Sequence, residues 1–232
     1  RSELKNVASI LQTLARYVFD TKNVFKPYEY IATGQNSAGF HAVEYIIFRD
    51  GQPRSYDDLT ADELYYAQSA AKDLHLAALK LVQAWGGEIS DDEQAILDDA
   101  EWEPDRNYGE YFLSLSGMDA AVQMIEGCRD IISEVAEGKI GSAYTGDDTN
   151  YIESPYAYNS IQDFTDNILS CQHALFGALK ATEPQSGSLI AYTDAQSTLK
   201  TQSAAVKEAL DTALEKIKAM KYPFVQIGRA HV

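Results

Sequence analysis

Apolar residues recur at every third or fourth position through most of the chain, beginning with residues 3 to about 20. An α-helix brings positions i, i+3, i+4 and i+7 onto one face, so this spacing predicts amphipathic helices. No segment sustains the alternation of apolar and polar residues that is typical of a β-strand. We therefore predict an all-α chain of long helices, which usually pack as bundles.

Capping and breaking residues give the expected bounds of the first helices. Thr60 and Glu63 form a capping-box pattern that opens a helix running to Trp85, and the glycines at 86–87 stop it. Ser37 is the expected N-cap of an earlier helix, which the segment 50–53 (Asp-Gly-Gln-Pro) ends. Both helices are expected to present one apolar face to a core.

The second half of the chain is predicted to alternate long helices with polar breaks. Residues 88–115 are acidic and aromatic, and we interpret them as one short helix and an irregular connection. Helices are expected over residues 117–138, about 159–181 and about 189–220, with a polar loop over 139–158 and a break at 184–187. The favoured boundary between two helical halves lies in residues 100–116, which gives domains over 3–113 and 114–226.

The two ends of the chain have the character of foreign sequence. Residues 227–232 read IGRAHV, which a widely used sequencing adaptor encodes in one frame, and Arg1-Ser2 matches the other strand of that adaptor. We therefore expect residues 1–2 and 227–232 to be artefacts and set them aside from the interpretation of the fold.

Charge excludes two classes of partner. Nineteen basic residues stand against 35 acidic ones, a formal net charge of −16. This field repels a phosphate backbone, so nucleic acid is not an expected partner, and it equally disfavours an anionic membrane surface. No run of about 20 apolar residues occurs, so the sequence predicts no membrane-spanning helix.

Common catalytic signatures are missing from the sequence. It contains no His-Glu-x-x-His, no glycine-rich phosphate loop and no Gly-x-Ser-x-Gly elbow. The two cysteines, Cys128 and Cys171, lack the spacing of metal ligands. We interpret them as buried thiols and keep a disulfide as the alternative.

His41 and Glu44, within GFHAVEYIIF, are the first candidates for chemistry. Three positions apart on one predicted helix, they lie about 60° apart on the same face. Such a pair can share a metal, or the carboxylate can orient the imidazole through a hydrogen bond. Spacing alone is also compatible with an ordinary core histidine, although Glu44 needs some partner in so apolar a helix. Gly39 is expected to let another backbone approach the start of the helix.

The second candidate region is the polar run IESPYAYNSIQDFTDNILS, residues 152–170. Asp163 and Asn167 are four positions apart and therefore share a helix face. A polar loop before a helix N-terminus can bind an anion or line a cleft. Ser160 and Asp163 also fit simple helix capping, and this alternative stays open.

Taken together, these segments resemble the imelysin family. Gly39-Phe40-His41-Ala42-Val43-Glu44 resembles that family's Gly-x-His-x-x-Glu motif. GKIGSAY followed by the run 152–170 resembles its second characteristic region, and the closing KYPFV resembles the end of such domains. The resemblance covers residues 3–225.

The resemblance implies an architecture and a site. It implies two helical-bundle halves, of which the first (3–113) is incomplete and carries the motif helix near the junction with the second (114–226). The absent helices would pack against residues 3–86. His41 and Glu44 become the metal or ligand residues. The second-region candidates, some of which we expect to meet the motif across the junction, are Glu153, Ser154, Tyr156, Asn159, Ser160, Asp163 and Asn167.

The resemblance also implies a function. Its members are bacterial envelope proteins, periplasmic or lipid-anchored at the outer membrane, and are often tied to iron or haem acquisition. We expect a non-enzymatic protein that binds iron, haem, another divalent metal or an iron-uptake partner, with membrane attachment only through an N-terminal lipid anchor outside this chain. The alternatives are a metallopeptidase of the imelysin type and a structural, partner-docking bundle. Two ligands do not complete a metal site, so others must come from elsewhere.

Overall fold

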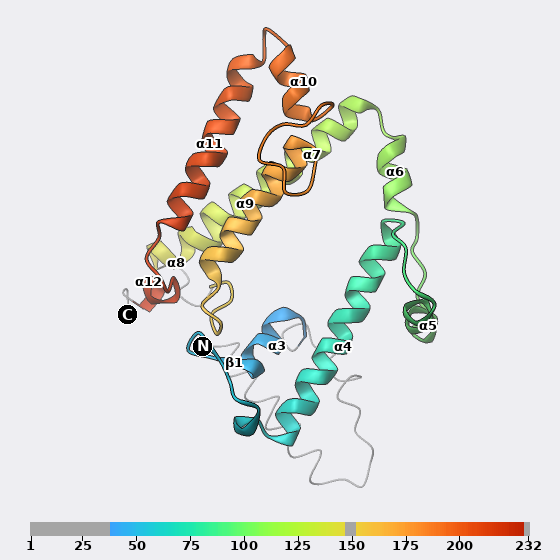
Figure 1. Cartoon of the computed structure of the whole chain (residues 1–232), viewed down its shortest axis with the longest axis vertical. Helices are drawn as coiled ribbons and strands as arrows, with labels where there is room; N and C mark the ends of the chain where they lie inside the picture. Colours follow the sequence, from blue (N-terminus) through green and yellow to red (C-terminus); the bar gives the residue numbers. More distant parts are fainter. Residues whose placement is uncertain (1–37, 147–151, 230–232) are drawn as a thin grey trace. The chain divides into compact units, whose positions relative to one another are not determined.

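The computed structural model describes residues 38–146 and 152–229, whose regular secondary structure is almost entirely helical (Figure 1). The predicted all-α fold class is thereby confirmed. The chain divides into two compact units, Arg1–Ser114 and Leu115–Val232. Within the described residues, no helix is both long enough and apolar enough to cross a membrane.

The first described helix, α3 (Phe40–Ile47), begins later than the sequence predicts. Its N-cap is Gly39 and not Ser37, which lies outside the described residues. Gly39 has a φ of +84°, a left-handed conformation that glycine adopts without the steric penalty of a Cβ atom. Among the described residues, nothing lies within 4 Å of where that Cβ would be, and the left-handed backbone by itself accounts for the glycine.

A short hairpin follows α3 where only a helix end was expected. Strand β1 (Phe48–Arg49) pairs antiparallel with β2 (Gln52–Pro53). Between them Asp50 and Gly51 have φ values of 49° and 76°, as a tight turn of type I′ requires. Asp-Gly is a strong signal for this turn, and the sequence interpretation treated it only as a helix stop.

The longest described helix of the first unit, α4 (Ala61–Ala84), confirms the predicted capping box. The Thr60 hydroxyl accepts from the Glu63 backbone N–H at 3.1 Å, and the Glu63 carboxylate accepts from the Thr60 N–H at 2.9 Å. Gly86, with a φ of +74°, follows the C-cap Trp85 and ends the helix as expected. Helix η2 (Tyr56–Asp58) is a single 3₁₀ turn before α4.

Residues 88–115 contain two short helices instead of one. A second capping box, Ser90 with Glu93, opens α5 (Asp91–Asp99). Helix α6 (Tyr108–Ser114) ends the unit. The acidic first turn of α5 suits the positive end of a helix dipole, which explains how so polar a segment is helical.

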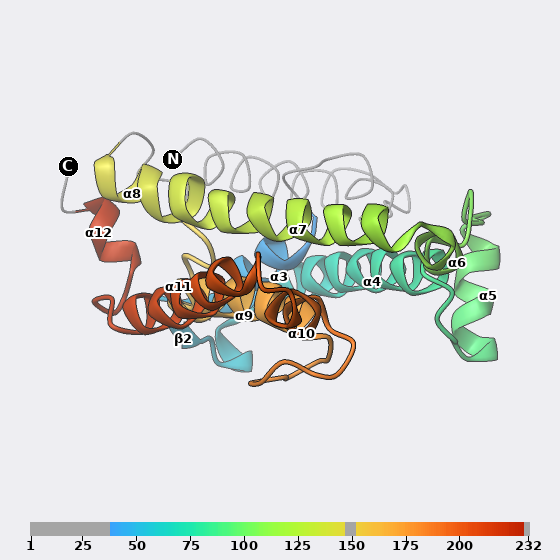
Figure 2. The same ribbon diagram turned by 90° about the horizontal axis from the view of Figure 1, so that it is seen from above.

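In the second unit α7 (Gly117–Ser133) leads into a π-helical segment, η3 (Glu134–Gly141), and then into α8 (Ser142–Thr145). Figure 2 shows these three segments following one another along one line. The helix therefore continues past residue 138, and the predicted polar loop begins about seven residues later than expected.

The remaining helices of this unit are α9 (Ser160–Phe176), α10 (Leu189–Ala195), α11 (Lys200–Lys218) and α12 (Val225–Arg229). Helix α9 packs against both α7 and α11 (Figure 1). It ends at Gly177, whose φ is +85°, and not near residue 181. The single helix predicted over 189–220 is wrong: Gln196 is extended, the chain folds back, and α10 packs beside α11.

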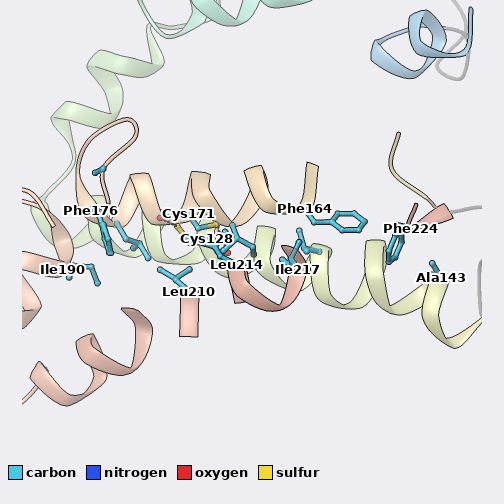
Figure 3. Packing of buried hydrophobic residues seen from close by; sticks show 14 residues of the cluster. Cys128, Ala143, Phe164, Cys171, Phe176, Ile190, Leu210, Leu214, Ile217 and Phe224 are labelled. Atoms are coloured by element: carbon cyan, nitrogen blue, oxygen red, sulfur yellow. Dashed lines mark hydrogen bonds between the residues drawn. The ribbon is translucent and has the colours of Figure 1, made fainter. Parts of the chain in front are cut away.

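One apolar core joins the helices of the second unit (Figure 3). At one end the rings of Phe164 and Phe224 meet edge to face, with centroids 5.0 Å apart. Cys128 of α7 and Cys171 of α9 lie together in the same core, and their burial agrees with our interpretation of them. The loop before α9 and the segment η3 rest on this core, which positions the second candidate region.

Candidate functional site

His41 and Glu44 form a hydrogen-bonded pair on α3. The Nδ1 atom of His41 lies 2.8 Å from Oε2 of Glu44. The imidazole is 51% exposed, whereas the carboxylate side chain is only 10% exposed. The ring is thus not that of a core histidine, because it is the glutamate that is buried and the histidine that reaches solvent.

Glu44 is buried on a different side of α3 from the helix's apolar contact with α4. Ala42 and Ile46 share one face and are buried against α4 residues Tyr66 and Ala70, whereas Glu44, two positions from each, points away from that face. Withdrawing a carboxylate from water is costly unless it accepts hydrogen bonds, and the His41 ring supplies one. A carboxylate that accepts from Nδ1–H also fixes the tautomer in which Nε2 carries the lone pair. The pair therefore has the arrangement of an oriented imidazole ligand.

Arg54, which the sequence analysis did not single out, connects the end of α3 to neighbouring segments through hydrogen bonds. Its Nη1 donates to the carbonyl of Ile46 at 2.9 Å and to Oε1 of Glu63 at 2.8 Å. Its Nη2 donates to the carbonyl of Asp58 at 2.8 Å and to Oε2 of Glu63 at 3.3 Å. The hydrogen bond from Arg54 lowers the pKa of Glu63, although burial acts in the opposite direction. One guanidinium thus joins the end of α3, the turn η2 and the start of α4.

The second candidate region is organised around Lys139, whose side chain is only 14% exposed. Its Nζ lies 3.0 Å from Oε2 of Glu153, 3.4 Å from Oδ1 of Asn167 and 3.6 Å from Oε1 of Glu134. Burial lowers the pKa of Lys139, but the hydrogen bonds and charges of Glu153 and Glu134 outweigh it and leave that pKa above its usual value. Two of the predicted residues, Glu153 and Asn167, are therefore brought together by a lysine that was not singled out.

The other predicted residues lie in the loop before α9 and in its first turn. The Asn159 amide donates to Oδ1 of Asp163 at 2.8 Å, and the Ser160 hydroxyl donates to the carbonyl of Glu153. Asn159 is the N-cap but makes no side-chain capping bond, so the simple capping interpretation of Ser160 and Asp163 is wrong. The Ser154 carbonyl accepts from the Asn159 N–H at 3.3 Å, and Tyr156 is half-buried in the same loop.

One oxygen in this region lacks a hydrogen bond. Oδ2 of Asp163 is buried, and no donor reaches it within the part of the chain that the structure describes. A buried carboxylate oxygen without a donor is costly and calls for a ligand, a water or a further side chain.

The position of Lys139 depends on the π-helical segment η3. A Cβ atom at Gly141 would lie 2.8 Å from the carbonyl of Ala136, so the wider turn needs a glycine there. Such insertions are frequent at functional sites because they re-aim one side chain of a helix. The sequence signal was the segment GKIGSAY, residues 138–144, which was recognised as part of the second region without its lysine.

The structure leaves two expectations about the site as predictions. Across residues 38–146 and 152–229, no three His, Cys, Asp or Glu side chains gather into a group that could hold a metal ion. Any metal at His41 would therefore take its other ligands from elsewhere. We expected residues of the second region to meet His41 and Glu44 across the junction. This expectation concerns the placement of the two units, and it stays a prediction.

The fold and the site define a class of protein, a helical-bundle protein that carries an oriented histidine-glutamate pair in a Gly-x-His-x-x-Glu sequence. The family model of imelysin matches residues 9–228, and the chain belongs to this family. The resemblance described from the sequence is thereby confirmed.

A solved structure has a similar fold. It is a "putative iron-regulated protein A precursor" from Parabacteroides distasonis ATCC 8503, 23% identical, with a TM-score of 0.61 over 95% of this chain and 69% of that one. No curated protein matches the chain.

Proposed function

We propose that this protein acts in iron acquisition in the bacterial envelope and that His41 binds the iron, either as the ion or within haem. The observation that carries the proposal is the 2.8 Å hydrogen bond between a buried Glu44 and a half-exposed His41. Membership of the imelysin family supports it, as does the name of the Parabacteroides protein, which is called iron-regulated and a precursor.

The chemistry of the pair suits iron. Imidazole nitrogen is a common iron ligand, and a carboxylate behind the ring raises its basicity and holds its orientation. Haem iron already has four porphyrin nitrogens and needs only an axial ligand, which one histidine can provide. A free iron ion would need several further ligands, but a net charge of −16 favours its approach over that of the anionic haem. Iron is the chemistry common to both, and the experiment separates the two.

The test is a titration of the purified protein with ferrous iron, ferric iron and haemin in separate arms, followed by absorbance and calorimetry. We expect saturable binding in one arm, a loss of binding in His41→Ala, and a decrease in affinity of about 10–100-fold in Glu44→Gln. His75→Ala is the matched control, because His75 is 50% exposed and also lies near a glutamate, 4.0 Å from Glu93.

Two results would overturn the proposal. One is the absence of iron and haem binding in all arms with folded protein, as judged by circular dichroism. The other is equal binding by His41→Ala and His75→Ala. Degradation of casein that is lost in Glu44→Ala would instead favour the metallopeptidase alternative, in which an activated water and a base are required. The envelope location is tested separately, by fractionation of cells that express the natural gene.

A further inference from the structure

The two cysteines of the chain lie against each other in the core of the second unit. Cys128 belongs to α7 and Cys171 to α9, 43 positions later in the sequence. Sγ of Cys128 is 3.9 Å from the carbonyl oxygen of Cys171, and Sγ of Cys171 is 3.6 Å from the carbonyl oxygen of Cys128. Figure 3 shows the two side chains together between the helices.

This contact is reciprocal, which distinguishes it from the burial of two unrelated thiols. A cysteine side chain is one carbon long, so each sulfur can reach the other residue's backbone only if the two residues face each other across the helix interface. A disulfide needs this juxtaposition of facing, adjacent residues. The chain has no other cysteine, so no third thiol competes for either partner.

We propose that Cys128 and Cys171 form a disulfide that cross-links α7 to α9 when the chain folds in an oxidising compartment. Its occurrence in the cell rests on the proposed envelope function, since disulfides persist in the periplasm and are rare in the cytosol. The ability of the pair to close is a property of the fold and does not depend on iron.

The oxidant is a disulfide, supplied by a thiol-disulfide oxidoreductase in the cell. The thiolate of one cysteine attacks one sulfur of that disulfide, forms a mixed disulfide and releases one thiolate, which takes up a proton. The other cysteine, losing its proton, then attacks the sulfur of the first and releases the second thiol. Two thiols become one disulfide, and the two electrons and two protons reduce the oxidant to two thiols.

The contact also changes the acidity of the two thiols. The hydrogen bond from the Cys171 thiol lowers the pKa of Cys128 to about 7, although burial acts in the opposite direction. The same hydrogen bond, together with burial, raises the pKa of Cys171. Cys128 and Cys171 are only 7% and 1% exposed, so the reaction with the oxidant takes place during folding or local opening. Once the core has formed, the disulfide is buried in it.

The experiment refolds the whole chain from denaturant in a mixture of oxidised and reduced glutathione. The product is denatured, treated with a thiol-alkylating reagent and analysed by mass spectrometry with and without a reductant. We expect no alkylation before reduction, two alkylations after it, and a peptide that joins Cys128 to Cys171. For a 43-residue loop the oxidised form should melt on the order of 10 °C above the reduced form.

Cys128→Ala/Cys171→Ala is the control, and its melting temperature should not respond to oxidant or reductant. Two alkylated thiols after oxidative refolding would overturn the proposal, as would a persistent glutathione adduct or disulfide-linked dimers on a non-reducing gel. None of these results bears on His41, which lies in the other unit. Failure of iron binding with a closed disulfide would reject the proposed function alone.

Discussion

The two units of the protein bury their apolar residues differently. In the second unit one continuous core draws on α7, η3, α8, α9, α10, α11 and the segment before α12. The described part of the first unit has two small clusters, one between α3 and α4 and one between α4 and α5. Leu81 of α4 and its C-cap residue Trp85 are 62% and 54% exposed. The second unit is thus held by packing over its whole length, whereas α3 is held by one small apolar cluster and by the hydrogen bonds of Arg54 at its end.

The polar groups of the two candidate regions differ in the same way. His41 and Glu44 are three positions apart and meet wherever α3 is helical. Lys139 meets Glu153 and Asn167, 14 and 28 positions later, only when α9 is docked beside η3. The first arrangement is local and the second is a product of the core beneath it. Substitutions in each unit should therefore have different consequences.

The largest effect is expected from Phe164→Ala in the core of the second unit. Phe164 is fully buried against Phe224, and its loss should lower the free energy of unfolding by about 3–5 kcal/mol. The same change at Phe40, which is 75% exposed on α3, should lie within about 0.5 kcal/mol of wild type. Urea unfolding followed by circular dichroism measures both. Equal effects would contradict the view that packing, and not local structure, holds the second unit.

This difference explains which features the sequence could predict. The capping box of Thr60 and Glu63 and the pair of His41 and Glu44 are set by spacing within one helix, and spacing is visible in a sequence. The break at Gln196 was missed because the residues 189–220 keep a helical pattern throughout, and it is the packing of α10 against α9 and α11 that folds the chain back.

Long-range polar contacts were the least predictable part. Arg54 was invisible because its role depends on the hairpin that returns it to the end of α3. Lys139 was invisible because a π-helical turn shifts the register by which helix faces are assigned. The sequence could name the second region by its resemblance to a family, but not the cation around which it is organised.

Arg54→Ala should give the next largest effect, and it tests how much the hydrogen bonds of Arg54 stabilise the position of α3. Removing the guanidinium takes away the ion-pair partner of Glu63. Because the side chains of Arg54 and Glu63 are only 14% and 22% exposed, the free energy of unfolding should fall by about 2–4 kcal/mol. Arg129→Ala is the control, because its contact with Asp130 is 68% and 71% exposed and should contribute below about 0.5 kcal/mol. Denaturant unfolding of both variants gives the comparison. A small effect at Arg54 would mean that apolar contacts alone hold α3.

Lys139→Met should have the smallest effect of the three, and pH gives it a signature. The variant removes the cation shared by Glu153 and Glu134 and should cost about 1–2 kcal/mol at neutral pH. Lys207→Met is matched to it, since the pair of Lys207 and Asp194 lies in the same unit but is one third exposed (33% each). We expect that variant to lose less than about 1 kcal/mol.

The sign of the pH dependence follows from the raised pKa of Lys139. A group whose pKa is higher in the folded state contributes its full stabilisation below its unfolded value, about 10.4 for lysine, and loses it as pH rises through the folded pKa. Wild type should therefore lose stability above about pH 10.4 more steeply than Lys139→Met. Unfolding curves measured from pH 8 upward test this. Parallel loss in wild type and Lys139→Met would show that Lys139 is not the cation that holds the second region together.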